Sequence, residues 1–190
     1  MTGTTDTDRS PKIGTPSPAD QLGGKGPDIA CGDFDIRIGR DGTWYYHGSP
    51  IGRKPLVRLF ASVLRREDDG SFWLVTPVER GRIIVDDAPF TAVELTVTGT
   101  GTQQVLRFRT NLDDEVVVDA AHPLRVAADA ESGEPSPYIL VRDGLEARLT
   151  RPVFFELVAL AEKRAAEREE IYGVWSSGQY FPIGSLGEEA

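Results

Sequence analysis

Apolar and polar residues alternate through much of the chain between residues 28 and 150, which is the period of a β-strand. The clearest segments are residues 34–38, 93–97 and 145–149, where an apolar residue occupies every second position. Short turn sequences rich in Asp and Gly separate such segments and favour hairpins. Further strands are predicted at residues 43–46, 72–75, 82–85, 105–109, 116–118, 124–126 and 138–141. We therefore predict mostly antiparallel strands.

Two segments have the 3.6-residue period of an amphipathic helix instead. Residues 55–64 place large apolar side chains on one side, and Pro55 suits the first turn of a helix. Residues 152–170 begin in a similar way after Thr150, a residue type that caps helices. Because residues 161–170 are rich in helix-forming and charged residues, we predict one long helix with a solvated face there.

The order of these elements repeats along the chain. Both halves contain a strand, an Arg-Asp-Gly turn, a second strand, a helix that opens on proline, and a glycine followed by aromatic residues. The turns are Arg40-Asp41-Gly42 and Arg142-Asp143-Gly144, and the glycines are Gly70 and Gly178. We predict an α+β fold of two small lobes with repeated β-β-α-β-like motifs, two main helices and an interdomain cleft. Small ligands tend to bind in clefts at such junctions.

Composition indicates where the folded part begins and ends. Residues 1–27 are rich in proline and glycine and contain few large aliphatic side chains, so we predict a disordered tail there. Residues 28–80 are predicted to form the N-terminal α+β lobe. Residues 81–184 are predicted to form a C-terminal α+β lobe with antiparallel strands and the long helix, and residues 185–190 a flexible end.

The charge and composition of the 190-residue chain exclude several classes of protein. A net charge of −9 argues against binding duplex nucleic acid, which needs a positive surface. One Cys and two His supply neither a disulfide framework nor the usual zinc site, and we predict no metal and no cofactor. No segment approaches the roughly 20 apolar residues that span a bilayer, and no signal sequence is visible. We expect a cytoplasmic protein that does not bind membranes.

Arginine is the residue type that most suggests binding. Arginines recur in and beside the predicted turns of this acidic chain. Guanidinium groups pair with carboxylates and phosphates, and with aromatic rings they can hold an anionic, planar ligand. Ion pairs with the many acidic residues would explain most of these arginines without any ligand.

His122 is the main candidate for catalysis. It lies in a predicted loop before Pro123 and shortly after Asp119. It could act as a general base or ligand contact, or it could be a strand-end side chain bound to a carboxylate. Catalysis would require a hydroxyl or carboxylate within hydrogen-bond reach in an open pocket. Since nothing in the sequence demands a reaction, we favour binding over catalysis.

Many motifs in order resemble one known family. They include residues 44–53, 56–61, 73–79, 86–90, 110–114, 122–126, 137–138, 141–147 and 173–176. Over about residues 28–184 the chain resembles an uncharacterised bacterial family, the domain of unknown function 1285 (DUF1285). The resemblance implies a two-domain fold with repeated motifs, an interdomain cleft, and a role in signal transduction through a nucleotide-like ligand. It implies no enzymatic activity.

We therefore predict a ligand-binding or regulatory protein that holds a small anionic ligand, such as a nucleotide, in the cleft. The predicted ligand-binding residues are Trp44, Arg53, Glu79, Asn111, Asp113, His122, Arg125, Tyr138, Arg142 and Trp175. The arginines would neutralise phosphate, Asn111 and Asp113 would bind ribose or base edges, and the aromatic residues would stack. The alternative is a protein–protein interaction module without a small ligand. A cleft filled with apolar side chains and an exposed apolar patch elsewhere would favour that alternative.

Overall fold

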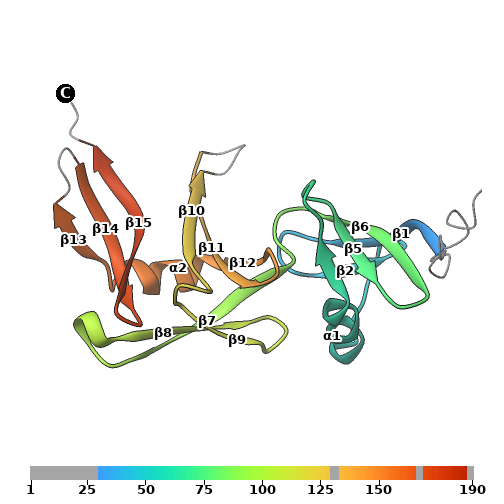
Figure 1. The fold of residues 1–190 in the computed structure, drawn as a ribbon, viewed down its shortest axis with the longest axis horizontal. Helices are drawn as coiled ribbons and strands as arrows, with labels where there is room; N and C mark the ends of the chain where they lie inside the picture. Colours follow the sequence, from blue (N-terminus) through green and yellow to red (C-terminus); the bar gives the residue numbers. More distant parts are fainter. Residues whose placement is uncertain (1–29, 129–132, 166–168, 188–190) are drawn as a thin grey trace, which may run out of the picture.

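The computed structural model describes residues 30–128, 133–165 and 169–187. It shows an elongated molecule of two lobes (Figure 1). The N-terminal lobe comprises residues 30–85, the linker residues 86–89, and the C-terminal lobe the described residues from 90 to 187. Two helices and mostly antiparallel strands confirm the α+β class and the two-lobed architecture.

The N-terminal lobe consists of one sheet and one helix. Its elements are β1 (Ala30–Ile38), β2 (Trp44–Tyr46), β3 (Ser49–Pro50), α1 (Lys54–Ser62), β4 (Leu64–Arg66), β5 (Phe72–Val75) and β6 (Glu79–Val85). The strands lie in the order β3-β2-β1-β6-β5-β4, and only the β1–β6 pair is parallel. α1 covers one face of this sheet, and its buried residues Val57 and Ala61 belong to the hydrophobic core (Figure 1).

A glycine in β6 allows the centre of this sheet to pack. A Cβ atom on Gly81 would lie 2.3 Å from the ring of Phe34, which belongs to the adjacent strand β1. Real Cβ atoms do not approach a ring so closely, so any side chain at residue 81 would displace Phe34.

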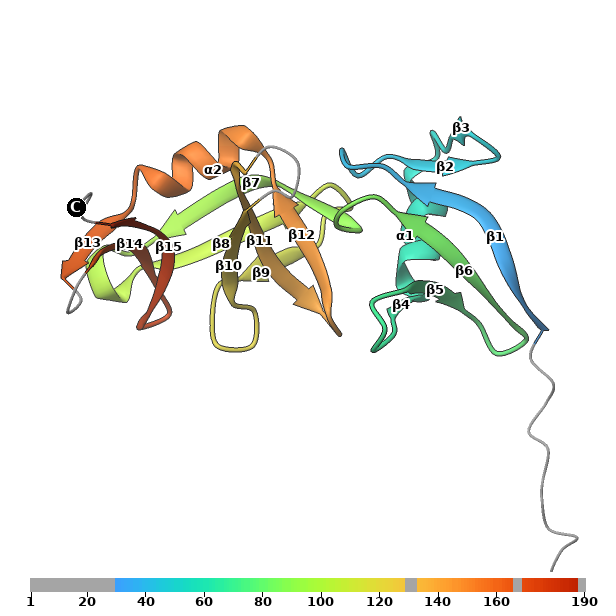
Figure 2. The same cartoon turned by 90° about the horizontal axis from the view of Figure 1, so that it is seen from above.

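The C-terminal lobe has two sheets and one helix. Its elements are β7 (Phe90–Thr98), η2 (Gly101–Gln103), β8 (Val105–Thr110), β9 (Glu115–Val117), β10 (Leu124–Ala128), β11 (Pro135–Arg142), β12 (Leu145–Leu149), α2 (Arg151–Val158), β13 (Glu162–Ala165), β14 (Glu169–Ser176) and β15 (Gln179–Gly187). The larger sheet has the order β10-β11-β12-β7-β8-β9, with β12 parallel to β7, and β13-β14-β15 form a separate antiparallel sheet. α2 packs against β7 (Figure 2).

The predicted long helix over residues 152–170 is wrong in its second half. α2 ends at Val158, and residues 162–165 form β13. That strand pairs with β14 in a register that runs from Glu162 opposite Gly173 to Ala165 opposite Glu170. The intrinsic helix preference of Ala, Glu, Lys and Arg is worth only fractions of a kcal/mol per residue, about 0–0.7, so strand pairing overrides it.

The repeat is present in the order of the elements. A hairpin, a helix and a three-stranded meander follow one another as β1-β2, α1, β4-β5-β6 and again as β11-β12, α2, β13-β14-β15. The two halves differ in pairing. In the first half β6 pairs with the first hairpin strand, β1, whereas in the second half β7 pairs with the second hairpin strand, β12, and β13-β14-β15 form a separate sheet. Gly70 precedes the second strand of its meander and Gly178 the third, so these two glycines are not equivalent.

The structure also moves two predicted boundaries. A lobe boundary between residues 80 and 81 would cut β6, whose Ile83 is buried in the N-terminal core, so this lobe extends to Val85. The predicted flexible end at residues 185–190 overlaps β15, which continues to Gly187. The predicted tail at residues 1–27 and residues 188–190 lie outside the described residues. Among the described helices, none is long and apolar enough to cross a membrane.

Candidate functional site

A pocket of about 540 Å³ opens between the two lobes. The N-terminal lobe contributes the turn between β1 and β2, and the C-terminal lobe contributes β11, β12 and the first turn of α2. The lining residues are Arg40, Asp41, Thr91, Glu134, Pro135, Pro137, Arg148, Leu149, Thr150, Arg151, Phe154 and Phe155. This volume lies within the range of about 300–1,000 Å³ that is typical of small-molecule sites.

Three arginines from both lobes surround this interlobe pocket. Arg148 and Arg40 both approach Asp87 of the linker, with Arg148 Nη1 3.2 Å and Arg40 Nε 3.5 Å from the carboxylate Oδ2. The Arg151 guanidinium lies over the ring of Phe155, 5.6 Å from its centroid. That ring is 60% exposed although it is large and apolar. The pocket thus combines cationic groups with an open aromatic surface.

Asp41 at the rim of the pocket is bound within its own turn. Its carboxylate accepts hydrogen bonds from the Thr43 backbone N–H at 3.0 Å and from the Thr43 hydroxyl at 2.8 Å. These hydrogen bonds hold the pKa of Asp41 below its usual value. Asp41 therefore stays ionised and fixes the turn that carries Arg40.

Tyr138 and Arg125 form a polar layer next to Asp87. The Tyr138 hydroxyl donates to Asp87 Oδ1 at 2.7 Å, and burial together with this hydrogen bond raises the pKa of Tyr138. The Arg125 guanidinium lies 4.2 Å from the centre of the Tyr138 ring. Arg125 is bound in a bidentate pair by Glu146, at 2.5 and 2.7 Å, which raises the pKa of Arg125. Neither Tyr138 nor Arg125 lines the pocket.

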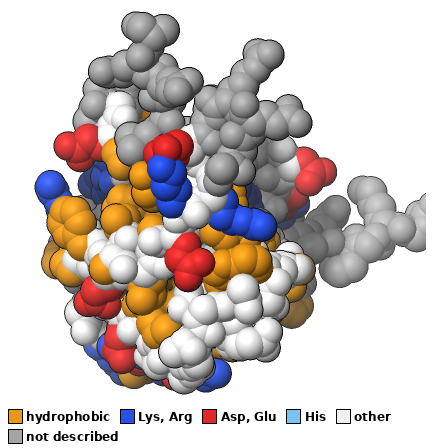
Figure 3. Space-filling model, turned by 90° about the vertical axis from the view of Figure 1, so that its left-hand side faces the viewer, with side chains coloured by type: hydrophobic (Ala, Val, Ile, Leu, Met, Phe, Trp, Pro, Cys, Tyr) orange, Lys and Arg blue, Asp and Glu red, His pale blue; other side chains and the backbone are white. Residues whose placement is uncertain are grey.

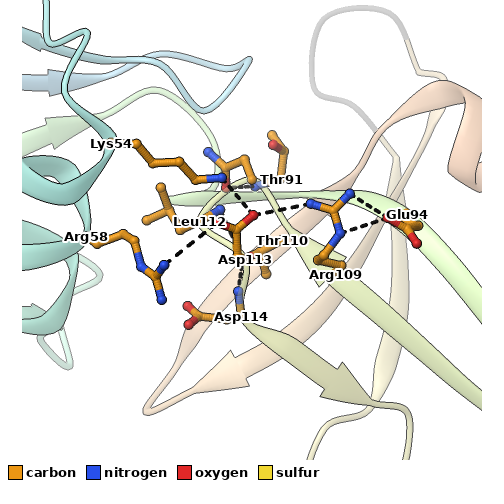
Figure 4. A network of polar contacts seen from close by, with 10 residues as sticks. Lys54, Arg58, Thr91, Glu94, Arg109, Thr110, Leu112, Asp113 and Asp114 are labelled. Atoms are coloured by element: carbon orange, nitrogen blue, oxygen red, sulfur yellow. Dashed lines mark hydrogen bonds and ion pairs between the residues drawn. The ribbon is translucent and has the colours of Figure 1, made fainter.

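A second polar cluster joins the lobes around Asp113 (Figure 4). Asp113 lies in the turn between β8 and β9 and accepts a hydrogen bond from Lys54 Nζ at 2.7 Å. Nη1 of Arg58 and Nη1 of Arg109 lie 3.7 and 3.3 Å from its carboxylate oxygens. The hydrogen bond from Lys54 lowers the pKa of Asp113 against a smaller effect of desolvation. Since Lys54 and Arg58 belong to α1, this cluster ties the two lobes together.

Further side chains cross the junction, and one of them, Arg66, donates from Nη1 to the carbonyl oxygen of Gly144 at 3.2 Å. Asn111 donates from Nδ2 to the carbonyl oxygen of Gly42 at 3.2 Å. Arg142 donates from Nη2 to the carbonyl oxygen of Ala61 at 2.9 Å. These contacts fix the relative position of the lobes by hydrogen bonds to backbone. Within the described ranges, no group of three His, Cys, Asp or Glu side chains converges as a metal site requires.

Comparison with known families assigns both lobes. The model described as "Domain of unknown function (DUF1285), N-terminal domain" matches residues 26–88. The model described as "Protein of unknown function (DUF1285), C-terminal domain" matches residues 89–183. The chain belongs to the DUF1285 family. The boundary between the two family domains falls within the linker.

Two solved DUF1285 proteins are similar to this chain. A protein from Silicibacter pomeroyi DSS-3 has 47% sequence identity and a TM-score of 0.77, with 84% of this chain and 85% of that chain covered. A protein from Shewanella baltica OS155 has 25% identity and a TM-score of 0.53, with 66% of this chain and 91% of that chain covered. No protein in the search of curated proteins matches this chain.

The residues predicted to bind a ligand do not form one site in this DUF1285 protein. Asn111, Asp113 and Arg142 lie at the junction but are bound to groups of the other lobe. Arg125 and Tyr138 form the layer next to Asp87. None of the ten predicted residues lines the interlobe pocket.

The remaining five predicted residues lie apart from one another. Trp44 is 1% exposed and packs in the core against Phe60, so it is no stacking surface. Arg53 is the exposed N-cap residue of α1, and Glu79 is the exposed first residue of β6. His122 lies in a turn with its Nδ1 3.1 Å from Asp119 Oδ1, which matches the strand-end interpretation. The indole N–H of Trp175 donates to the Glu162 carboxylate within the β13-β14-β15 sheet.

The sequence contained a partial signal for the pocket residues that were missed. Arg40 was interpreted only as part of the Arg-Asp-Gly turn. Arg148 and Arg151 belong to the arginines that suggested binding, but they were not among the predicted ligand-binding residues. Neither the turn nor the helix start indicates that the two meet across the junction. That contact depends on how the linker places the lobes.

Proposed function

We propose that this DUF1285 protein binds a small anionic ligand with an apolar or planar part in the interlobe pocket. The observation that carries the proposal is the approach of Arg40 from one lobe and Arg148 and Arg151 from the other, beside the exposed ring of Phe155. Guanidinium groups suit phosphate or carboxylate, and an aromatic surface suits a planar ring.

The overall charge of −9 is compatible with this proposal. Charge screening limits the effect of distant acidic residues to about 8–10 Å at physiological salt, so the groups at the pocket decide. Three arginines and two acidic residues, Asp41 and Glu134, line it. A small anion therefore meets three guanidinium groups, two of which also pair with Asp87, whereas an extended nucleic acid would also meet the acidic surface.

A nucleotide is the ligand class that combines both features, with phosphates for the arginines and a base for Phe154 or Phe155. A role in signal transduction in the cytoplasm belongs to this proposal, because a ligand between two lobes can change how they are oriented. No reaction is proposed, since His122 lies outside the pocket.

The exposed apolar side chains at one end of the molecule do not single out a protein partner instead. Figure 3 shows one end of the molecule, where hydrophobic side chains are interspersed with charged and polar ones. The pocket itself carries arginines rather than a purely apolar lining. The arginines of the pocket thus favour a small anionic ligand over a second protein.

The test is a thermal-shift screen of nucleotides and phosphorylated metabolites, followed by calorimetry on each hit. We expect at least one compound to raise the melting temperature of the wild type, and Arg148→Gln to abolish this effect. Arg107→Gln is the matched control, because Arg107 is an exposed arginine of β8 that pairs with Glu115 and does not line the pocket. Equal responses of the two variants, or no response of the wild type, would rule the proposal out.

A further inference from the structure

We infer that Arg151 is the residue of the interlobe pocket that contacts the anionic group of the ligand, and that this ligand carries one phosphate, as a nucleoside monophosphate does. The inference rests on the proposed function, because it names the ligand class of the same pocket. It follows from the partners of each arginine at the pocket and from the balance of charges there.

The three arginines of the pocket differ in the partners that they already have. Arg148 Nη1 lies 3.2 Å from Asp87 Oδ2, and its Nη2 donates to the Ser136 hydroxyl oxygen at 3.3 Å. Arg40 Nε lies 3.5 Å from the same carboxylate oxygen, and Arg40 has a further partner as well. Arg151 is exposed, and no carboxylate of the described residues pairs with it. An external anion can therefore bind Arg151 without displacing an internal one.

Positive and negative groups are balanced at the pocket. Its three arginines face three carboxylates, because Asp41 and Glu134 line the pocket and Asp87 pairs with two of the arginines. One phosphate finds the guanidinium group of Arg151. Each further phosphate would bring more negative charge next to these carboxylates and would have to compete with them for an arginine. A ligand with one phosphate therefore fits the charges of the pocket better than a di- or triphosphate does.

Asp41 suits a hydroxyl group of such a ligand. The two hydrogen bonds from Thr43 lower the pKa of Asp41 and keep it ionised, so its carboxylate only accepts hydrogen bonds. An ionised carboxylate has about four lone-pair sites, more than the two hydrogen bonds from Thr43 use. It can therefore accept a hydrogen bond from a ribose hydroxyl, whereas it repels a phosphate.

Arg151 and Phe155 offer neighbouring contacts for a phosphate and a base. They lie one turn apart on α2, with the guanidinium group 5.6 Å from the centre of a ring that is 60% exposed. In a nucleoside monophosphate a single ribose joins the phosphate to the planar base. Both groups can thus contact the same exposed surface of α2.

Arg148 acts in this arrangement through Asp87 and not on the ligand. Oδ2 of Asp87 is buried and accepts no hydrogen bond from any described residue, so ion pairing compensates its charge. Removal of Arg148 would leave this carboxylate with less positive charge nearby, and it would repel a phosphate in the adjacent pocket. Arg148→Gln should therefore abolish binding indirectly, and Asp87→Asn in the same chain should restore it.

The first experiment measures binding to the full chain by calorimetry without divalent cations. The probes are the 5′-mono-, di- and triphosphates of adenosine, guanosine, cytidine and uridine. We expect a monophosphate to bind about tenfold more tightly than the triphosphate of the same base, which corresponds to about 1.4 kcal/mol. Arg151→Gln should abolish this binding. Arg107→Gln, which changes an exposed arginine outside the pocket, should leave it unchanged.

The outcomes distinguish the inference from the proposed function. Wild-type affinity in Arg151→Gln, or a triphosphate that binds as tightly as the monophosphate, would overturn the inference and leave the proposed function in place. The same holds if a phosphorylated metabolite binds in the thermal-shift screen and no nucleotide does. If no compound binds to the wild type, both are wrong.

The second experiment tests whether Arg148 acts through Asp87. The chain with Arg148→Gln and Asp87→Asn is compared with each single variant for binding of the tightest monophosphate, and circular dichroism checks that each chain is folded. We expect the double variant to regain binding, whereas Arg151→Gln combined with Asp87→Asn should not bind. A folded Arg148→Gln, Asp87→Asn chain that does not bind would show that Arg148 contacts the phosphate itself, and the assignment to Arg151 would be wrong. If this chain does not fold, the first experiment decides the inference by itself.

Discussion

The side-chain amide of Asn111 bridges the two lobes at Gly42. Its Nδ2 donates to the Gly42 carbonyl oxygen at 3.2 Å, and its Oδ1 accepts the backbone N–H of Thr91 at 3.1 Å. The Asn111 backbone N–H also donates to the Thr91 carbonyl oxygen at 2.8 Å. One half-buried side chain therefore satisfies a group in each lobe beside the interlobe pocket, which Thr91 also lines.

Asn111→Ala is expected to destabilise the protein by about 1–3 kcal/mol, because the Thr91 N–H and the Gly42 carbonyl group lose their side-chain partner. Urea unfolding of the variant and the wild type measures this difference. Thr102→Ala serves as the control, since Thr102 is exposed and far along the C-terminal lobe. A change in the free energy of unfolding no larger than that of the control would show that the bridge contributes little.

The glycine at residue 42 gives a second prediction. Gly42 has φ +80°, and a Cβ atom on it would lie 2.7 Å from Asn111 Nδ2. Gly48 has φ +73° with no atom within 4 Å of such a Cβ. Each Gly→Ala change costs about 1–2 kcal/mol for the left-handed conformation. We expect Gly42→Ala to be more destabilising than Gly48→Ala in urea unfolding, because only residue 42 also disturbs the contact between the lobes. Equal losses would contradict this.

The acid stability of the protein depends in part on Asp113. The hydrogen bond from Lys54 lowers the pKa of Asp113 in the folded state. Its contribution to stability is therefore fully present above the unfolded pKa of about 3.9 and is lost as the pH falls through the lower folded value. Asp113→Asn, which tolerates the φ of +68° at this position, should lower stability at neutral pH and make the loss in acid shallower.

The salt dependence of stability distinguishes the contribution of Asp113 from that of Asp69, another carboxylate with a lowered pKa. Hydrogen bonds from Ser71 lower the pKa of Asp69, and these bonds come from a neutral partner within the N-terminal lobe. Urea midpoints measured from about pH 2.5 to 7 at low and high salt should show a salt sensitivity that Asp113→Asn reduces and Asp69→Asn leaves unchanged. The same salt dependence in both variants would exclude a specific role of the Asp113 ion pairs.

Local patterns predicted the fold better than they predicted the site. Alternation identified the hairpin partners β7 and β8, and proline with apolar spacing identified α1. Residues 162–165 were missed as a strand because Glu, Lys, Arg and Ala prefer helices, and only their pairing with β14 makes them extended. Short edge strands such as β3 carry too few residues to show a period.

The site escaped prediction for a different reason. Arg40 and Arg148 are separated by more than a hundred residues, and Asp87 of the linker brings them together. Arg142 and Asp113 were predicted to contact a ligand because residues of their types bind phosphate or ribose. In the structure, each of them instead binds a group of the other lobe. Residue type alone does not show whether a guanidinium group faces a backbone carbonyl, a carboxylate or an open pocket.

Variants of two residues of α2 should distinguish an effect on stability from an effect on ligand binding. Leu157 is fully buried, whereas Phe155 is 60% exposed and lines the pocket. Leu157→Ala should cost about 2–5 kcal/mol through lost burial and a cavity, as measured by urea unfolding. Phe155→Ala should leave the free energy of unfolding nearly unchanged, because its ring already contacts water, but it should weaken binding of any nucleotide found in the thermal-shift screen. Ligand affinity that is unaffected by Phe155→Ala would mean that the ring does not contact the ligand, whereas strong destabilisation would assign Phe155 to the core instead.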